Sequence, residues 1–284
     1  MSAVSLLAGD KDDAVLAQVQ RALAHRGREA VLLSNLANVE VTTPVGGAPG
    51  APAFGTEGKY WQVSARSAAL IVNMSFYFAE GEADPVTRYR WSENHAAWLT
   101  FFALFPGLAV NRPSSHSPPI HNDGLLVRSL ARSLGMPVVP ERIASAGTVE
   151  TPGQVFAAID LASGAGLWVR SGERTAALVS RLEYAPDAEH CVVVVLPGDA
   201  FALSQRAGDA ECSVDPAPDA EKVGWARRLL GALGLDYGYV VFVRLDRAWA
   251  MTRVYTSPPL PVDGSAIEMI AGKLSAILCP DVAR

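Results

Sequence analysis

The stretch Phe105-Pro106-Gly107-Leu108-Ala109-Val110-Asn111-Arg112-Pro113 divides the chain. It predicts a short strand over 108–110, because three apolar residues lie between the turn signals Pro-Gly and Asn-Arg-Pro. The next residues, 113–121, are rich in Pro and Ser and are predicted to form a loop. We therefore expect a first domain to close at about residue 112.

The start of the chain predicts a parallel sheet. A strand over 4–8, a helix with apolar residues at helical spacing from Ala14 to Leu23, and a strand over 31–33 form a β-α-β unit. The turn after the first strand lacks a G-x-G-x-x-G pattern, which argues against a dinucleotide site there.

The remaining elements of this first domain are less regular. Residues 44–58 are rich in Gly, Pro and Ala and are expected to form a mobile surface loop. Strands are expected over 59–63 and 69–74, and residues 88–93 are expected to lead into a helix that continues to Leu104.

The rest of the chain predicts two mixed lobes. The middle third is expected to begin with a helix that is capped by Asn122 or Asp123 and ended by Gly135. After this helix we expect an extended piece at 138–140, a polar turn at 144–153, a helix at 155–161 and a strand at 167–170. The last third is expected to contain a hairpin of 191–196 with 200–204, a loop at 208–220, a helix at 219–232, strands at 239–245 and 248–255, and a helix at 264–278. The predicted fold class is α/β with α+β lobes, divided into residues 1–112, 113–186 and 187–284.

Composition excludes several classes of protein. The chain has 284 residues and a formal net charge of −5, which gives no basic field for nucleic acid. No apolar run approaches the roughly 18 residues of a membrane helix. Three cysteines lie far apart without metal-type spacing, as is typical of free thiols in a reducing compartment. We therefore expect a cytoplasmic protein that binds neither nucleic acid nor a membrane.

Three phrases of the sequence resemble those of a known superfamily. They are the stretch 105–113, the run from Asn122-Asp123-Gly124-Leu125 through Gly135-Met136-Pro137-Val138-Val139-Pro140, and Leu233-Gly234-Leu235-Asp236-Tyr237-Gly238. In this order and spacing the chain resembles ATP-grasp ligases, above all those that modify ribosomal peptides (the microviridin and graspetide type) and related glutamate ligases. The resemblance implies an N-terminal parallel-sheet domain and two α+β subdomains.

The resemblance also implies residues for ATP and magnesium, and this sequence departs from them. The two nucleotide lysines of the family correspond to Asp123 and Arg170, and no lysine lies between Lys59 and Lys222. The magnesium ligands of the family, an Asp and a closing Glu-x-Asn pair, correspond to Val241 and to Arg253-Val254-Tyr255. No acidic residue lies between Asp246 and Asp263, so a small shift of the alignment does not restore the pair.

Several residues are candidates for ligand binding, each with a structural alternative. Asp123 is interpreted mainly as a helix cap. Arg170 either holds an anion or forms a salt bridge, and Arg253 either replaces the metal as a fixed positive charge or pairs with a carboxylate and seals the pocket. The other candidates are Arg88, Arg90 and Glu93, which border the acceptor site of the family or begin a solvated helix, and Asn111, Arg244 and Tyr255. The histidines lack the spacing of a zinc site.

We therefore hypothesise a pseudo-ligase of a bacterial biosynthetic pathway that binds a small molecule, a peptide or a partner protein. No cofactor is expected, and a homodimer is compatible with the sequence. The alternative is a working ligase that forms an amide or ester through an acyl phosphate, with Arg170 and Arg253 in place of lysine and magnesium. A third hypothesis is reuse of the cleft for chemistry without a cofactor.

Overall fold

A computed structural model gives the architecture of the chain. It describes residues 3–34, 36, 39–43, 51–56, 58–72, 85–113, 124–145, 155–160, 166–170, 178–182, 188–206, 209–246 and 248–280. The chain divides into two units: Met1–Ile120 with Gly234–Asp236 and Ile267–Arg284, and His121–Leu233 with Tyr237–Ala266. The predicted boundaries after residues 112 and 186 stay a prediction.

The first unit contains a four-stranded sheet in the order β2-β1-β6-β7. Its strands are β1 (Val4–Ala8), β2 (Glu29–Leu33), β6 (Ala68–Ile71) and β7 (Leu108–Val110). Every pair in it is parallel, and β1 and β6 are buried along their whole length. Strands buried on both faces have continuous apolar sequences, which is why VSLLA and AALI carry almost no polar residue. The predicted parallel sheet is confirmed.

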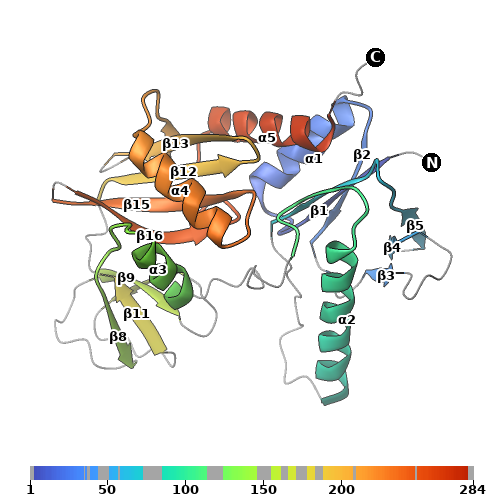
Figure 1. Ribbon diagram of the computed structural model, residues 1–284, viewed down its shortest axis with the longest axis horizontal. Helices are drawn as coiled ribbons and strands as arrows, with labels where there is room; N and C mark the ends of the chain where they lie inside the picture. Colours follow the sequence, from blue (N-terminus) through green and yellow to red (C-terminus); the bar gives the residue numbers. More distant parts are fainter. Residues whose placement is uncertain are drawn as a thin grey trace. The chain divides into compact units, whose positions relative to one another are not determined.

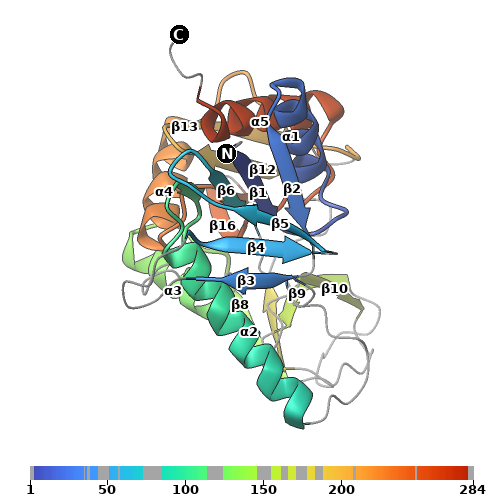
Figure 2. The ribbon, with the colours of Figure 1, turned by 90° about the vertical axis from the view of Figure 1, so that its right-hand side faces the viewer.

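Helices cover both faces of this sheet. Helix α1 (Ala14–His25) begins at Asp13, whose side chain accepts hydrogen bonds from the Val15 and Leu16 amides. Helix α5 (Gly264–Leu278), from Ile267 onward, lies beside α1 in both views (Figure 1; Figure 2). Helix α2 (Pro85–Ala103) packs against the other face.

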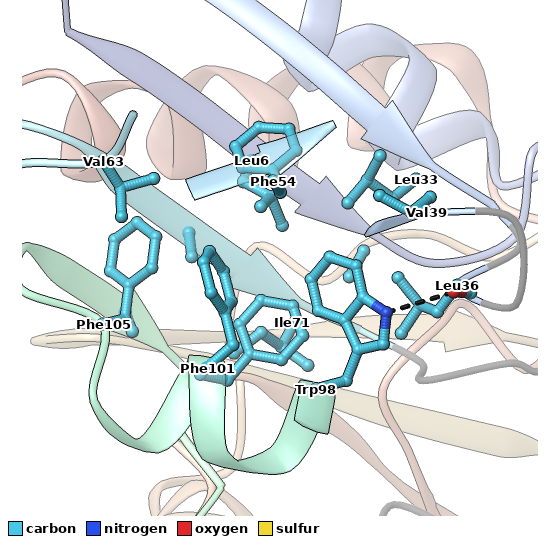
Figure 3. Packing of buried hydrophobic residues seen from close by; sticks show 14 of the residues in the cluster. Leu6, Leu33, Leu36, Val39, Phe54, Val63, Ile71, Trp98, Phe101 and Phe105 are labelled. Carbon is cyan, nitrogen blue, oxygen red and sulfur yellow. Dashed lines mark hydrogen bonds between the residues drawn. The ribbon is translucent and has the colours of Figure 1, made fainter. Parts of the chain in front are cut away.

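Aromatic side chains of α2 form the core of this unit. Trp98 and Phe101 are fully buried, and their rings meet edge to face at 5.3 Å between centroids. The Trp98 indole N–H donates to the Leu36 carbonyl over 3.1 Å, which satisfies the one polar group of the ring. Figure 3 shows these rings lying against Leu6 and Ile71 of the sheet. Trp98 is therefore a core residue of this unit.

A small antiparallel sheet corrects one expectation. Strands β3 (Glu40–Thr42), β4 (Ala53–Thr56) and β5 (Lys59–Gln62) pair in the order β3-β4-β5. The predicted loop over 44–58 is therefore wrong at 53–56, where Phe54 is buried and stacks on Trp61. A Cβ at Gly55 would lie 2.4 Å from the Tyr60 ring, so any other residue at position 55 would displace that ring. The Gly- and Pro-rich composition concealed this short strand.

The second unit contains a five-stranded antiparallel sheet in the order β14-β13-β12-β15-β16. Its strands are β12 (His190–Leu196), β13 (Asp199–Gln205), β14 (Ser213–Val214), β15 (Gly238–Leu245) and β16 (Ala248–Tyr255). Helix α4 (Ala220–Ala232) packs on β12 and is capped by Asp219. The predicted hairpin, helix and final strand pair are confirmed, and β14 is a short addition within the expected loop.

The second sheet of this unit, β10-β9-β11-β8, corrects another expectation. Its strands are β8 (Glu141–Ser145), β9 (Val155–Asp160), β10 (Gly166–Arg170) and β11 (Leu178–Leu182). The predicted helix over 155–161 is wrong, because β9 pairs antiparallel with both β10 and β11. A run of six mostly apolar residues fits a strand or a helix equally well, and only the neighbouring strands decide. The predicted turn over 144–153 is likewise wrong at its first two residues, which end β8.

Helix α3 (Gly124–Ser133) and the following extended piece agree with expectation. Gly135 adopts a φ of 75°, the left-handed conformation that ends many helices. The proposed caps Asn122 and Asp123, the loop over 114–121 and the histidines at 116 and 121 lie outside the described residues. In the part of the chain that the structure describes, no helix is long and apolar enough to cross a membrane.

Candidate functional site

The candidate site is one face of the β15–β16 hairpin. Cross-strand pairs Tyr239↔Tyr255 and Val241↔Arg253 lie on the same face, because successive side chains of a strand alternate. The hairpin turns at Asp246, whose φ of 52° is left-handed. We call this surface, formed by Tyr239, Val241, Arg253 and Tyr255, the Arg253 face.

A β-bulge at Thr252 sets which residues reach this face. The register passes from Val241↔Arg253 to Phe242↔Met251, so Thr252 has no partner residue on β15. Its hydroxyl donates to the Val241 carbonyl over 3.1 Å, which keeps the bulge bonded. Without the bulge, Met251 and Arg253 would lie on the same face of the sheet, because they are two residues apart. With the bulge, Arg253 lies on the face of Val241 and Met251 lies on the face of Phe242.

Hydrogen bonds connect polar groups at this face. The Arg253 Nη1 donates to the Tyr255 hydroxyl over 2.9 Å. The hydroxyls of Tyr237 and Tyr239 lie 2.6 Å apart and share a hydrogen bond, and both side chains are buried. Val241 is buried as well, while Arg253 and Tyr255 are half-buried. The face therefore combines a buried floor with two polar groups within reach of solvent.

The opposite face of the same strands packs against α4. Trp225 of α4 stacks on Phe242 at 6.2 Å between centroids, and the buried Lys222 lies 4.0 Å above the Trp249 ring. Lys222 also lies 3.5 Å from Asp219, the cap of its own helix. This lysine therefore belongs to the α4 side of the sheet and not to the Arg253 face.

Arg244 is a predicted site residue that the structure separates from the others. It pairs with Trp249 across the hairpin and donates to the Glu189 carboxylate over 2.9 Å. Since Arg244 follows Phe242 by two residues, it lies on the α4 side of β15. Arg253 and Tyr255 are thus brought together, and Arg244 is not.

The outer edge of β16 is covered by the segment after α3. Val138 pairs with Met251 in a parallel bridge, so this segment continues the sheet beyond β16. The buried Arg128 of α3 donates to the carbonyls of Val139 and Thr252. Arg128 thus holds the backbone of the bulge next to Arg253. Sequence reasoning missed this role, because an arginine on an amphipathic helix is usually solvated.

Asn111 has a structural role in the first unit. It lies at the end of β7, is buried, and adopts a left-handed φ of 59°. Its backbone N–H donates to the Asp236 carboxylate over 3.2 Å, and its side-chain oxygen accepts from the Asp236 amide over 2.9 Å. Its side-chain nitrogen donates to the Ile71 carbonyl over 3.1 Å. The backbone N–H and the side-chain amide of Asn111 are therefore already hydrogen-bonded within the protein, and these are the groups that a ligand would contact.

The remaining candidates lie elsewhere. Arg88, Arg90 and Glu93 are within α2, which begins at Pro85 and not after residue 93, and Glu93 is exposed. Arg170 is the last residue of β10 and pairs with Val155. The side chains of Arg88, Arg90 and Arg170 lie outside the described residues. Their roles in binding stay predictions.

Comparison with solved structures identifies the architecture. The chain is similar to the macrocyclase MdnC of Microcystis aeruginosa, bound with precursor peptide MdnA, with 13% identity, coverage of 98% of this chain and 100% of that chain, and a TM-score of 0.69. It is similar to the ATP-grasp ligase PsnB, complexed with minimal precursor, Mg and ADP, with 17% identity, coverage of 99% and 98%, and a TM-score of 0.66. The chain has an ATP-grasp fold.

A further ATP-grasp structure extends the same likeness. It is the RiPP-associated ligase of Chryseobacterium gregarium, in complex with ADP and a leader and core peptide, with 10% identity, coverage of 100% and 98%, and a TM-score of 0.67. No protein-family model matches the chain, and no curated protein matches it. At such low identity the likeness shows the fold alone.

The ATP-grasp fold implies magnesium, and the Arg253 face does not fit it. Mg²⁺ prefers carboxylate and other oxygen ligands in octahedral geometry. Neither β15 nor β16 carries an acidic residue, and the position facing Val241 is a guanidinium. A permanent positive charge there repels a divalent cation.

Proposed function

We propose that this chain is a pseudo-ligase, a protein of the ATP-grasp fold that binds a peptide without using Mg-ATP. The observation that carries the proposal is Arg253, which lies opposite Val241 where the resemblance calls for magnesium ligands. The lack of any lysine from residue 60 to residue 221 supports it, because phosphate groups of ATP are held by such charges. A peptide is the favoured ligand, since three similar proteins were solved with precursor peptides.

The proposal includes a cellular setting. Free thiols at Cys191, Cys212 and Cys279 suit the reducing cytoplasm. The similar proteins include one from Microcystis aeruginosa and one from Chryseobacterium gregarium, which supports a bacterial biosynthetic role.

Calorimetry with Mg-ATP tests the proposal. We expect no binding tighter than about millimolar, roughly −4 kcal/mol, because the implied nucleotide positions lack lysine and the implied magnesium positions lack a carboxylate. Micromolar, magnesium-dependent binding would refute the pseudo-ligase. The alternative, a ligase with arginines in place of lysine and metal, predicts ADP release with a peptide substrate and loss of that release in Arg170→Ala.

A further inference from the structure

Strand β5 is an open edge of the small antiparallel sheet. It pairs with β4 on one side only, and Figure 2 shows β4 lying between it and β3. The Val63 amide donates to the Pro52 carbonyl over 2.8 Å, in register with the residue pairs of β4 and β5. Since bonded and non-bonded pairs alternate in an antiparallel ladder, Tyr60 and Gln62 direct their N–H and C=O groups away from β4.

This edge lacks the devices that usually protect an exposed strand from pairing with another chain. β5 contains no proline and no bulge, and both Tyr60 and Gln62 are exposed, Tyr60 by 65%. Its one lysine, Lys59, points to the other face, where its ammonium lies 2.7 Å from the Glu29 carboxylate. In the described part of the chain, the outward N–H and C=O groups of Tyr60 and Gln62 have no hydrogen-bond partner.

The outer face beside this edge carries an aromatic ring and a carboxylate. Tyr60 is the cross-strand partner of Gly55, and its ring lies against that glycine. Its hydroxyl donates to the Glu40 carboxylate over 2.6 Å, which holds the ring and the carboxylate together. Glu40 is exposed and forms no ion pair among the described residues. A positively charged side chain can therefore lie over the ring and contact the carboxylate at the same time.

We propose that β5 binds an extended segment of the peptide as an added strand, with a basic side chain of that segment over the Tyr60 ring and beside Glu40. The backbone of the segment bonds to the outward groups of Tyr60 and Gln62, which gives an affinity that depends little on its sequence. Glu40 adds a preference for arginine or lysine. This inference rests on the proposed function only for the kind of ligand, because the strand edge requires neither ATP nor magnesium.

The test uses the full chain and a blocked pentapeptide of alternating threonine and valine with a central arginine. Calorimetry measures its binding to the wild type, to Gln62→Pro and to the matched control Gln62→Ala. Proline removes the outward N–H and is tolerated on edge strands, whereas alanine retains this donor. We expect proline to weaken binding about tenfold, in line with the loss of a backbone hydrogen bond, and alanine to leave the affinity within about twofold.

A second pentapeptide, with norleucine in place of arginine, tests the role of Glu40. The wild type should prefer the arginine peptide about threefold to tenfold, because that peptide adds an exposed ion pair and a contact with the ring. Glu40→Gln retains an acceptor for the Tyr60 hydroxyl and should reduce the preference to about twofold or less. Asp12→Asn removes a negative charge from an exposed position between β1 and α1, and should leave the preference unchanged.

Amide hydrogen exchange locates the bound peptide. The arginine peptide should slow exchange at Tyr60 and Gln62 and leave Trp61 unchanged, because the Trp61 N–H points to β4 in the free protein. Equal affinities of Gln62→Pro and Gln62→Ala, or protection at other residues alone, would overturn the inference. A dimer that binds no peptide and dissociates in Gln62→Pro would also overturn it, because a second copy would then occupy the edge.

Circular dichroism and the thermal midpoint verify that the variants fold. If Gln62→Pro does not fold, a pentapeptide N-methylated at every amide replaces it, and we expect this peptide to bind the wild type at least about tenfold more weakly. Equal binding of the methylated and unmodified peptides refutes the added strand. Micromolar Mg-ATP binding refutes the proposed function and leaves the result at β5 to be judged by the peptides alone.

Discussion

At the scale of single residues, Asn111 combines a strained backbone with three useful hydrogen bonds. Its left-handed φ of 59° costs an ordinary side chain about 1–2 kcal/mol, whereas asparagine tolerates it better. Its contacts with Asp236 join the end of β7 to a segment more than 120 positions later. The tolerated backbone conformation and these contacts explain why residue 111, in the stretch 105–113, is an asparagine.

Substitution of Asn111 separates these two effects. Asn111→Ala loses the side-chain bonds and retains the strain, so we expect a loss of about 3 kcal/mol in the free energy of unfolding. Asn111→Gly loses the same bonds without the strain and should be roughly 1 kcal/mol more stable than the alanine variant. Urea unfolding measures both. An alanine variant as stable as the glycine variant would show that the φ angle carries no strain.

At the scale of elements, the start of β15 depends on a glycine. A Cβ at Gly238 would lie 2.8 Å from the Tyr255 carbonyl oxygen and 3.3 Å from a methyl group of Leu230. The glycine therefore allows β15 to approach both β16 and α4. Because Tyr255 is part of the Arg253 face, this close approach also affects the site.

A pair of glycine substitutions tests that close approach. Gly238→Ala should destabilise the protein by about 1–3 kcal/mol, because backbone must move to accept the methyl group. Gly224→Ala, within α4, meets no atom within 4 Å and should stabilise the protein by about 0.5–1 kcal/mol, since alanine favours helix. Thermal unfolding compares the two variants. If Gly238→Ala leaves the thermal stability unchanged, β15 can move away from β16 and α4 without cost, and the close approach does not require glycine.

At the scale of the whole molecule, alkaline pH should weaken the fold. Burial raises the pKa of the Cys191 thiol and of the Cys212 thiol from 9.0 to about 11. Between pH 9 and 11 the unfolded chain has lost these two protons and the folded chain retains them. Stability is therefore fully present below pH 9 and falls as the pH rises toward 11.

Urea midpoints at about pH 8 and pH 10.5 measure this loss. The double variant C191A/C212A, although less stable at pH 8 because of its cavities, should lose less stability between the two pH values. An equal loss in wild type and variant would assign the alkaline effect to other groups.

The sequence by itself determined the elements whose periodicity or punctuation is strong. The β-α-β start, the strand over 108–110, the final hairpin strands and the last helix follow from continuous apolar runs bounded by turn residues. It also determined that no lysine lies between Lys59 and Lys222 and no acidic residue between Asp246 and Asp263, because the composition of a segment is the same in every fold.

Only the tertiary structure decided the rest. Val155–Asp160 became a strand because β10 and β11 lie on either side of it, which local pattern does not show. The bulge at Thr252 placed Arg253 and Tyr255 on the face of the hairpin opposite to Arg244, since side-chain direction relative to the partner strand depends on register. The bonds between Asn111 and Asp236 could not be predicted either, because they join residues that are distant in sequence and close only in the folded chain.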